Sequence, residues 1–225
     1  MTYADATLLA DELGVPVEEL DRAEFRPRYN IAPTDPYYIV RIRDEGREVV
    51  AARWGLVNSW AKDASMAARQ INARAETLAA RPAFREAYQK RRCVVPADGF
   101  YEWTGPKSDR QPFWFHRPDG RLLLMAGLYE SWQPKPGEWQ RTFTIVTTTA
   151  NELMAPFHDR MPVVLDEEQA SRWMFKTTPP ETLHRLMEPP PARALIATAV
   201  SKRVNSVAND DPSVMTPDPV APRLL

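Results

Sequence analysis

Glu102 is the residue whose setting points most directly to chemistry. It follows the turn-forming stretch 97–99 and lies between Tyr101 and Trp103. In a strand, alternate side chains face opposite sides, so the two aromatic rings would share one face. Glu102 would then share the other face with Phe100. Burial among apolar side chains raises the pKa of a carboxyl group, which makes Glu102 a candidate acid or base. The alternative is an exposed glutamate on the wet face of an edge strand.

His158 and Asn72 are the other two polar residues in unusual settings. His158 stands beside Asp159 and Arg160, and histidine is the side chain best suited to move protons near neutral pH. The alternative is a loop histidine that only pairs with Asp159. Asn72 and Arg74 offer amide and guanidinium donors on one side of an extended segment, which suits an oxyanion or a phosphate. The alternative for that segment is a polar loop that enters a helix.

The remaining side chains of chemical interest favour binding over metal chemistry. Trp54, Trp60 and Trp103 either fill the core or stack on unpaired bases, as in proteins that bind single strands. Cys93 is flanked by valine, a setting typical of a core thiol. With one cysteine and three scattered histidines, the chain has neither a disulfide framework nor the ligand spacing of a metal site. We therefore expect no metal and no cofactor.

Composition is that of an ordinary globular protein with uneven charge. The chain has 225 residues and a net charge of -1, which argues weakly against a protein that coats nucleic acid. Between Arg53 and Arg92, nine basic side chains stand against three acidic ones, a local charge of +6. This segment predicts either a positive face suited to phosphates or solvated helix faces. No apolar run is long enough to span a bilayer and no signal peptide is present, so we expect a cytoplasmic protein without a membrane partner.

Short strands separated by turn signals must position these residues. We expect helices over 5–13, 82–90 and 166–174, hairpins of 37–42 with 48–54 and of 111–116 with 121–132, and strands over 91–96, 100–103, 141–149, 161–165 and 194–200. This pattern predicts an α+β fold built on twisted, mainly antiparallel sheet. We expect a single domain over residues 1–225, with a proline-rich tail from about residue 212.

Six motifs follow one another across nearly the whole chain. They are Arg-Tyr-Asn-Ile-Ala-Pro-Thr (28–34), Arg-Trp-Gly-Leu-Val (53–57), Ser-Trp-Ala-Lys (59–62), Ile-Asn-Ala-Arg-Ala-Glu-Thr (71–77), Arg-Arg-Cys-Val-Val-Pro-Ala-Asp-Gly-Phe-Tyr-Glu-Trp (91–103) and His-Asp-Arg-Met-Pro (158–162). With a closing segment at 204–210, this set closely resembles the SOS-response-associated peptidase family. The resemblance implies a barrel-like core of antiparallel strands flanked by short helices.

The resemblance also implies a function in the DNA damage response, namely covalent capture of abasic sites in single-stranded DNA. In that family, the α-amine of a cysteine after the initiator methionine forms a Schiff base with the sugar aldehyde, and its thiol closes a thiazolidine ring. An α-amine with a pKa of about 7.7 to 8.0 is partly neutral at physiological pH, as a nucleophile must be. By motif, Glu102 would manage protons, His158 would assist ring opening, and Asn72 would orient the sugar or the N-terminus.

The same resemblance implies a DNA-binding surface around these three residues. Arg74 and Arg160 would hold phosphates, while Trp103 and the loop from Asn30 to Pro33 would shape the path of the strand. We expect a monomer of bacterial type, associated with the nucleoid when bound to DNA. A non-catalytic single-strand binder is the alternative. A peptidase, as the family name suggests, ranks below both because no triad of nucleophile, base and orienting residue is present.

The start of the chain departs from the family pattern. The family begins Met-Cys-Gly-Arg followed by Phe or Tyr, whereas Met1, Thr2 and Tyr3 stand here, which aligns best if a Cys-Gly pair is missing. Cys93 cannot replace that cysteine because the mechanism needs amine and thiol on one residue. Three explanations stay open: a sequence incomplete at its start, a member that has lost cross-linking, or a reversible Schiff-base lyase or plain binder.

Overall fold

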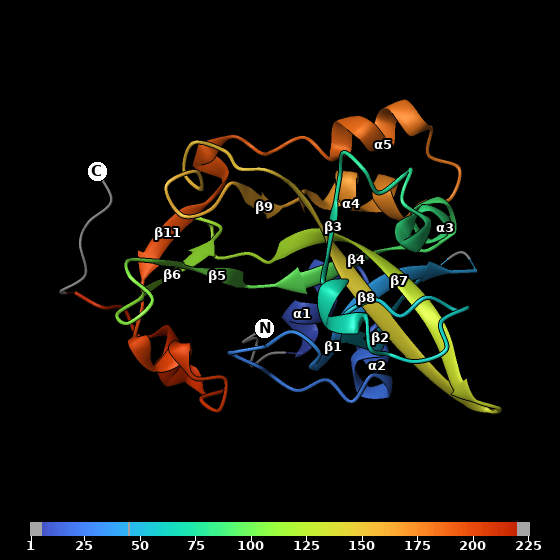
Figure 1. Ribbon diagram of the computed structural model, residues 1–225, viewed down its shortest axis with the longest axis horizontal. Helices are drawn as coiled ribbons and strands as arrows, with labels where there is room; N and C mark the ends of the chain where they lie inside the picture. The colour runs from blue at the N-terminus through green and yellow to red at the C-terminus, as the bar shows by residue number, and fades with distance from the viewer. Residues whose placement is uncertain (1–5, 45, 220–225) are drawn as a thin grey trace.

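A computed structural model describes residues 6–44 and 46–219 (Figure 1). The predictions for Met1, Thr2 and Tyr3 therefore lie outside the described residues. The elements are α1 (Ala6–Leu13), α2 (Val17–Arg22), β1 (Pro36–Arg43), β2 (Gly46–Trp54), η1 (Ala67–Arg69), β3 (Asn72–Arg74), α3 (Pro82–Lys90), β4 (Arg92–Ala97), β5 (Gly99–Thr104), β6 (Gln111–His116), β7 (Leu123–Lys135), β8 (Glu138–Thr149), β9 (Arg160–Pro162), β10 (Val164–Leu165), α4 (Glu167–Met174), α5 (Pro180–Leu186), η2 (Ala192–Ala194), β11 (Ile196–Ala199), η3 (Lys202–Asn205) and η4 (Pro212–Met215).

Five strands close into a barrel. They run in the order β7, β4, β1, β2 and β8, and β8 pairs back onto β7. The pairing of β2 with β8 is parallel, and the other four pairings around the ring are antiparallel. Strands β3 and β9 extend the barrel sheet from β8, and β10 extends it from β7. The predicted fold, a barrel-like α+β core of mainly antiparallel strands with short helices, is confirmed.

The hairpin predicted near the start of the barrel is present. Strands β1 and β2 pair antiparallel, with Val40 opposite Val49 and Ile39 opposite Val50. Asp44 in the connection has a φ of 53°, in the left-handed region that aspartate tolerates better than most residues. The turn chemistry and the alternating pattern therefore both specify this register.

A second, three-stranded sheet stands beside the barrel in the order β11, β6, β5. The predicted hairpin of 111–116 with 121–132 is wrong, because β6 pairs with β5 and β11 while β7 pairs inside the barrel. Residues 122–128 are all buried, as expected of a strand covered on both faces. Such a strand fits between β4 and β8, so the chain changes sheet at the loop that joins β6 to β7.

The helices lie outside the barrel and follow the expected boundaries. Pro82 begins α3, and Asp166 caps α4 in a capping box with Gln169. The buried Arg92 donates to the carbonyl oxygens of Trp173 at 2.6 Å and Tyr88 at 2.6 Å, which satisfies acceptors at the ends of both helices. The predicted helices over 82–90 and 166–174 are confirmed.

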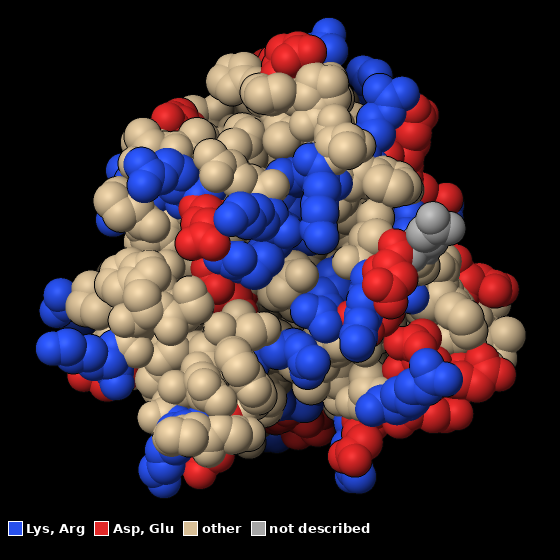
Figure 2. Space-filling view, turned by 90° about the vertical axis from the view of Figure 1, so that its right-hand side faces the viewer, with Lys and Arg blue, Asp and Glu red and all other residues tan. Residues whose placement is uncertain are grey.

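The basic segment 53–92 does not form a purely positive face. Arg92 is buried, and Arg91 pairs with Glu130 at 2.7 Å. Arg85 on α3 is exposed, as are Arg81 directly before the helix and Lys62 in the preceding loop. Figure 2 shows Lys and Arg side chains gathered in the middle of the face that bears α3, with Asp and Glu side chains among and beside them.

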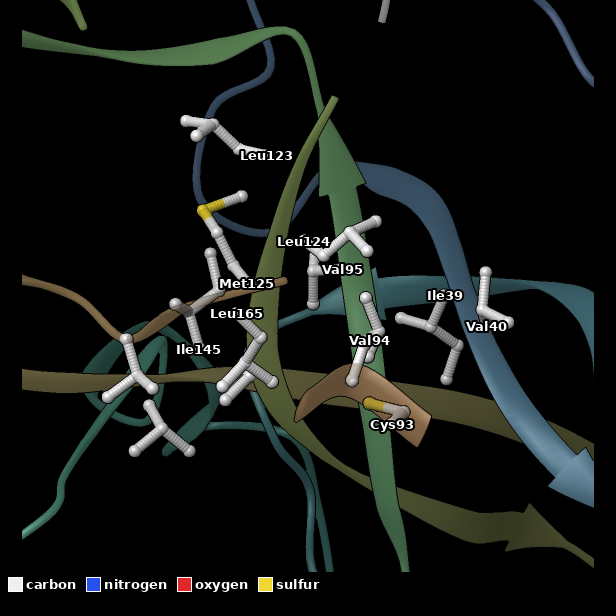
Figure 3. Close-up of a cluster of buried hydrophobic side chains, with 14 of the residues drawn as sticks. Ile39, Val40, Cys93, Val94, Val95, Leu123, Leu124, Met125, Ile145 and Leu165 are labelled. Carbon is white, nitrogen blue, oxygen red and sulfur yellow. The ribbon is translucent and has the colours of Figure 1, made fainter. Parts of the chain in front are cut away.

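Apolar side chains fill the barrel. Every residue of β4 is buried, and Figure 3 shows Cys93, Val94 and Val95 among side chains from β1, β7, β8 and β10. Burial raises the pKa of the Cys93 thiol, which keeps it protonated and unreactive. The prediction of a core thiol is confirmed.

Residues 200–217 pack against the second sheet. Val200 pairs with Pro217 in an isolated bridge, and Val214 of η4 is fully buried. Val200, Val204 and Val214 form a small apolar cluster that contacts Tyr29 and Tyr101. The stretch that begins the proline-rich tail is therefore part of the packed structure as far as it is described.

Candidate functional site

A cavity of about 370 Å³ opens between the end of the barrel and the second sheet. Its apolar floor includes Val95, Met125 and Phe143, which come from three barrel strands. Its rim is built from segments far apart in the sequence, among them the Tyr29 loop, β3, β5 and the segment before β9. The size and the mainly apolar lining are typical of a site for a small organic group.

Most residues proposed from the sequence line this cavity. Eight of the ten do so: Asn30, Pro33, Trp54, Asn72, Glu102, Trp103, His158 and Arg160. Trp60 and Arg74 lie outside it. The fold thus gathers the three candidate catalytic residues, which stand in three different strands or loops, around one space.

Glu102 reaches the cavity from β5, an edge strand whose partner is β6. It lies opposite Phe113, and its neighbours Tyr101 and Trp103 share one face with ring centres 6.4 Å apart, as predicted. Burial raises the pKa of the Glu102 carboxyl, and His158 and the backbone N–H of Trp103 offset only part of the rise. Glu102 is therefore a half-buried carboxyl with the raised pKa expected of an acid-base group.

His158 has two possible partners at one ring nitrogen. Its Nδ1 lies 2.9 Å from the backbone nitrogen of Arg160 and 3.0 Å from Oδ1 of Asp159. The N–H of Arg160 can donate only to an unprotonated Nδ1, which places the proton of the neutral ring on Nε2. A protonated ring can instead donate from Nδ1 to Asp159. Both charge states of His158 are thus accommodated, as a proton-transfer group requires.

Asn72 and Arg74 stand on the short strand β3, which pairs in parallel with β8. Both are exposed, whereas Ala73 between them is fully buried, so their side chains share one side as predicted. Asn72 borders the cavity, and Arg74 continues that side beyond its rim. Amide and guanidinium donors are therefore presented on one side of β3, and Asn72 lines the same cavity as Glu102 and His158.

The three tryptophans differ in their settings. Trp54 stacks on Phe143 with ring centres 6.4 Å apart and donates its indole N–H to the carbonyl of Ile71 at 2.9 Å, so it forms part of the wall. Trp103 donates to Oδ1 of Asn205 at 2.7 Å. Trp60 is 69% exposed. Of the three, Trp60 is the one free to stack on a base outside the cavity.

Asn30 and Asp210 join the first motif to the closing segment. The Asn30 amide donates to the carbonyl oxygens of Val204, Ser206 and Asn209 at 3.0 to 3.1 Å. Sequence reasoning placed Asn30 on the path of the DNA, but its buried side chain is occupied inside the protein.

Asp210 was not singled out from the sequence. Its Oδ1 accepts the backbone N–H groups of Tyr29 at 2.6 Å and Asn30 at 2.8 Å, and its other oxygen pairs with Arg28. Burial alone would raise the pKa of Asp210, but these donors outweigh burial and hold it below its ordinary value. The only sequence signal was the closing motif itself.

Across residues 6–44 and 46–219, no group of three or more His, Cys, Asp and Glu side chains is arranged to hold a metal ion. Within the same ranges, no helix has the length and apolarity needed to cross a bilayer.

The fold and the site together define a small barrel protein with an aromatic cavity whose rim carries acid-base groups. A family model described as SOS response associated peptidase (SRAP) matches residues 1–207. The chain belongs to this family. The abasic site processing protein YoqW of Bacillus subtilis is 40% identical over 199 residues, which cover 87% of this chain and 88% of that protein.

Two further similarities extend this relationship. The abasic site processing protein HMCES of Gallus gallus is 33% identical over 233 residues, covering 89% of this chain and 69% of that protein. A crystal structure of a protein from Bacteroides thetaiotaomicron matches with a TM-score of 0.74 at 28% identity, covering 82% of each chain. Proteins from a bacterium and from a vertebrate are thus similar to this chain over most of its length.

Proposed function

We propose that this protein recognises abasic sites in single-stranded DNA and captures the ring-opened sugar in the cavity described above. The observation that carries the proposal is the convergence of Asn72, Glu102 and His158 on one aromatic cavity. The names of the related proteins from Bacillus subtilis and Gallus gallus support the same substrate. A cavity of about 370 Å³ has room for a deoxyribose and for the amine that attacks it.

The chemistry begins with an amine and the aldehyde of the open sugar. The amine adds to the carbonyl carbon, and loss of one water from the adduct gives the imine. Glu102, with its raised pKa, supplies a proton to the departing oxygen, and His158 assists opening of the sugar ring. Asn72 orients the sugar, while Arg74 and Arg160 interact with the flanking phosphates.

The residue at position 2 decides how durable the capture is. In the sequence as printed it is Thr2, whose amine, once Met1 is removed, forms an imine. A hydroxyl closes a ring on that imine less favourably than a thiol does. A chain whose N-terminal residue is Thr2 is therefore expected to form a reversible Schiff base, trapped on reduction. Insertion of Cys-Gly after Met1 restores the family start and is expected to give a cross-link that survives without a reductant.

Three further expectations accompany this function. We propose that the protein acts as a monomer, that it works in the cytoplasm, and that it associates with the nucleoid when bound to DNA. The exposed Trp60 supports a preference for single strands, because an exposed indole can stack on an unpaired base. Binding of matched single-stranded and double-stranded abasic oligonucleotides measures that preference.

Borohydride trapping tests the proposal directly. The purified protein is incubated with a single-stranded oligonucleotide that contains one abasic site, and borohydride is added to reduce any imine. We expect a protein-DNA adduct that is absent with the intact oligonucleotide. The absence of an adduct from the native chain, with its N-terminus verified by mass, would refute the proposal.

A non-catalytic single-strand binder is the alternative supported by the exposed Trp60 and the basic residues on and around α3. Such a protein binds intact and abasic DNA alike, with an affinity that falls as salt rises. Its affinity for DNA is also unchanged by Glu102→Ala and by His158→Ala. Capture chemistry instead predicts that both substitutions slow trapping while binding to intact DNA is retained.

A further inference from the structure

Arg160 pairs with Glu76, a carboxylate that stands in the motif at 71–77 but was given no role from the sequence. Glu76 lies in the turn after β3, and its two oxygens accept N–H groups from Nη1 and Nη2 of Arg160 at 2.7 and 2.8 Å. Nη2 also donates to the carbonyl of Thr147 at 2.6 Å. A bidentate pair fixes the plane of the guanidinium more firmly than a single hydrogen bond does. The fork of Arg160 is therefore occupied before any DNA arrives.

Of the three guanidinium nitrogens of Arg160, Nε is the one left without an acceptor among the described residues. The Arg160 side chain is 15% exposed, and its Nε is buried with no hydrogen-bond partner among the residues that the structure describes. A buried donor without a partner costs about 1–3 kcal/mol. Such groups call for a specific explanation. Arg160 lines the cavity, but its buried Nε is shielded from it, so the pair with Glu76 fixes the position of the guanidinium rather than freeing a donor for a ligand.

Glu76 also connects two parts of the site. It follows β3, which carries Asn72, while the backbone N–H of Arg160 donates to His158. The pair therefore links the strand of Asn72 to the segment of His158. Hydrogen bonds from Arg160 hold the pKa of Glu76 below its ordinary value, so the carboxylate stays charged at neutral pH.

We propose that Glu76 is a positioning residue of this site: it occupies the fork of Arg160 and keeps Asn72 and His158 in register. The inference rests on the proposed capture of abasic sites. The rival role for Glu76 is that of a competitor, a carboxylate that a phosphate must displace from Arg160.

Glu76→Gln separates the two roles. A positioning residue predicts about a tenfold slower trapping of abasic DNA, because small misplacements of reacting groups cost one to two orders of magnitude. Binding to intact single-stranded DNA is unchanged or tighter, because a negative charge is removed. Faster trapping together with tighter binding would establish the competitor and overturn the proposal, as would unchanged trapping. Glu168→Gln is the matched control, since it removes a 2.7 Å pair with Arg172 on α4, away from the cavity.

A double-substitution cycle tests whether Glu76 acts through Arg160. Arg160→Lys keeps the charge but loses the fork, so adding Glu76→Gln to it should slow trapping no further. Additive losses would refute the coupling. Glu76→Asp keeps the charge but is one methylene shorter, so its carboxylate should not reach both Nη atoms. It replaces Glu76→Gln in the same measurement, with the same expected result, if the glutamine variant folds poorly. Failure of the wild-type chain to be trapped would refute the proposed function, whereas normal trapping by both Glu76 variants would refute this inference alone.

Discussion

The barrel and the rim of the cavity are built by different means. The barrel is held by backbone pairing and by apolar side chains such as Leu128 and Val95, which are buried almost completely. The rim is held by a few polar contacts between distant segments, chiefly those of Glu76 with Arg160 and of Asp210 with Tyr29 and Asn30. Many interchangeable apolar contacts give stability, whereas a few specific polar contacts give a defined site. The two regions should therefore fail in different ways when they are altered.

The largest effect on stability is expected in the barrel. Leu128→Ala removes a fully buried side chain of β7 and should lower the free energy of unfolding by about 2–5 kcal/mol. Trapping should persist at temperatures where the variant is folded. Denaturant unfolding measures the change. Leu8→Ala is the matched control, because Leu8 is 55% exposed and its loss should change stability by about 0.5 kcal/mol or less. Equal losses in both variants would contradict the assignment of the core.

The next largest effect is expected at the rim, on chemistry. Glu102→Gln should slow trapping about 100-fold, the scale of a lost acid-base group. Single-turnover trapping measures the rate, with Glu181→Gln on α5 as a control. An unchanged rate would remove Glu102 from the mechanism.

The same substitution has a predictable effect on stability. Because folding raises the pKa of Glu102, the folded state holds this proton more tightly than the unfolded state. The stabilisation that comes from this bound proton is fully present at low pH. It declines as pH rises from the ordinary pKa of a glutamate to the raised pKa of Glu102. The glutamine side chain of the variant does not titrate, so the free energy of unfolding of the variant should not show this decline with pH. A variant less stable than the wild type at neutral pH would contradict a buried, destabilised carboxylate.

A smaller effect is expected where the closing segment meets the first motif. Asp210→Ala leaves the N–H groups of Tyr29 and Asn30 without their acceptor and should cost about 1–3 kcal/mol. Because folding lowers the pKa of Asp210, its stabilisation is present above the unfolded pKa and is lost as pH falls through the folded pKa. The variant should therefore lose less stability on acidification than the wild type. Hydrogen exchange over residues 204–209 measures the loosening, and Asp11→Ala on α1 is the control.

The elements with local signals were predictable from the sequence. Alternation and turn residues specify the β1–β2 hairpin, Asp166 begins α4, and the order of residues in β5 places Tyr101 and Trp103 on one face. Family motifs identified most of the residues that line the cavity. The sequence could also predict the raised pKa of Glu102, because its aromatic neighbours imply burial.

The contacts between distant segments were not predictable. Glu76 and Arg160 are 84 residues apart, and Asn30 and Asp210 are 180 apart. Glu76 and Asp210 look like ordinary polar surface residues until the fold brings their partners near, and the motifs indicated DNA-binding roles for Arg160 and Asn30. The wrong prediction of a hairpin between β6 and β7 has a similar cause. The two strands are neighbours in the sequence, which favoured a hairpin, but β7 is buried on both faces and pairs inside the barrel.

Locating the trapped sugar tests the central claim most directly. The borohydride-reduced complex of the native chain with abasic single-stranded DNA is digested, and mass spectrometry identifies the residue that carries the sugar remnant. The account predicts one adduct, on the α-amine of the N-terminal residue, formed much more slowly after Glu102→Gln. An adduct on internal lysines such as Lys62 or Lys107, formed at the same rate in both proteins, would show that the cavity does not carry out the capture.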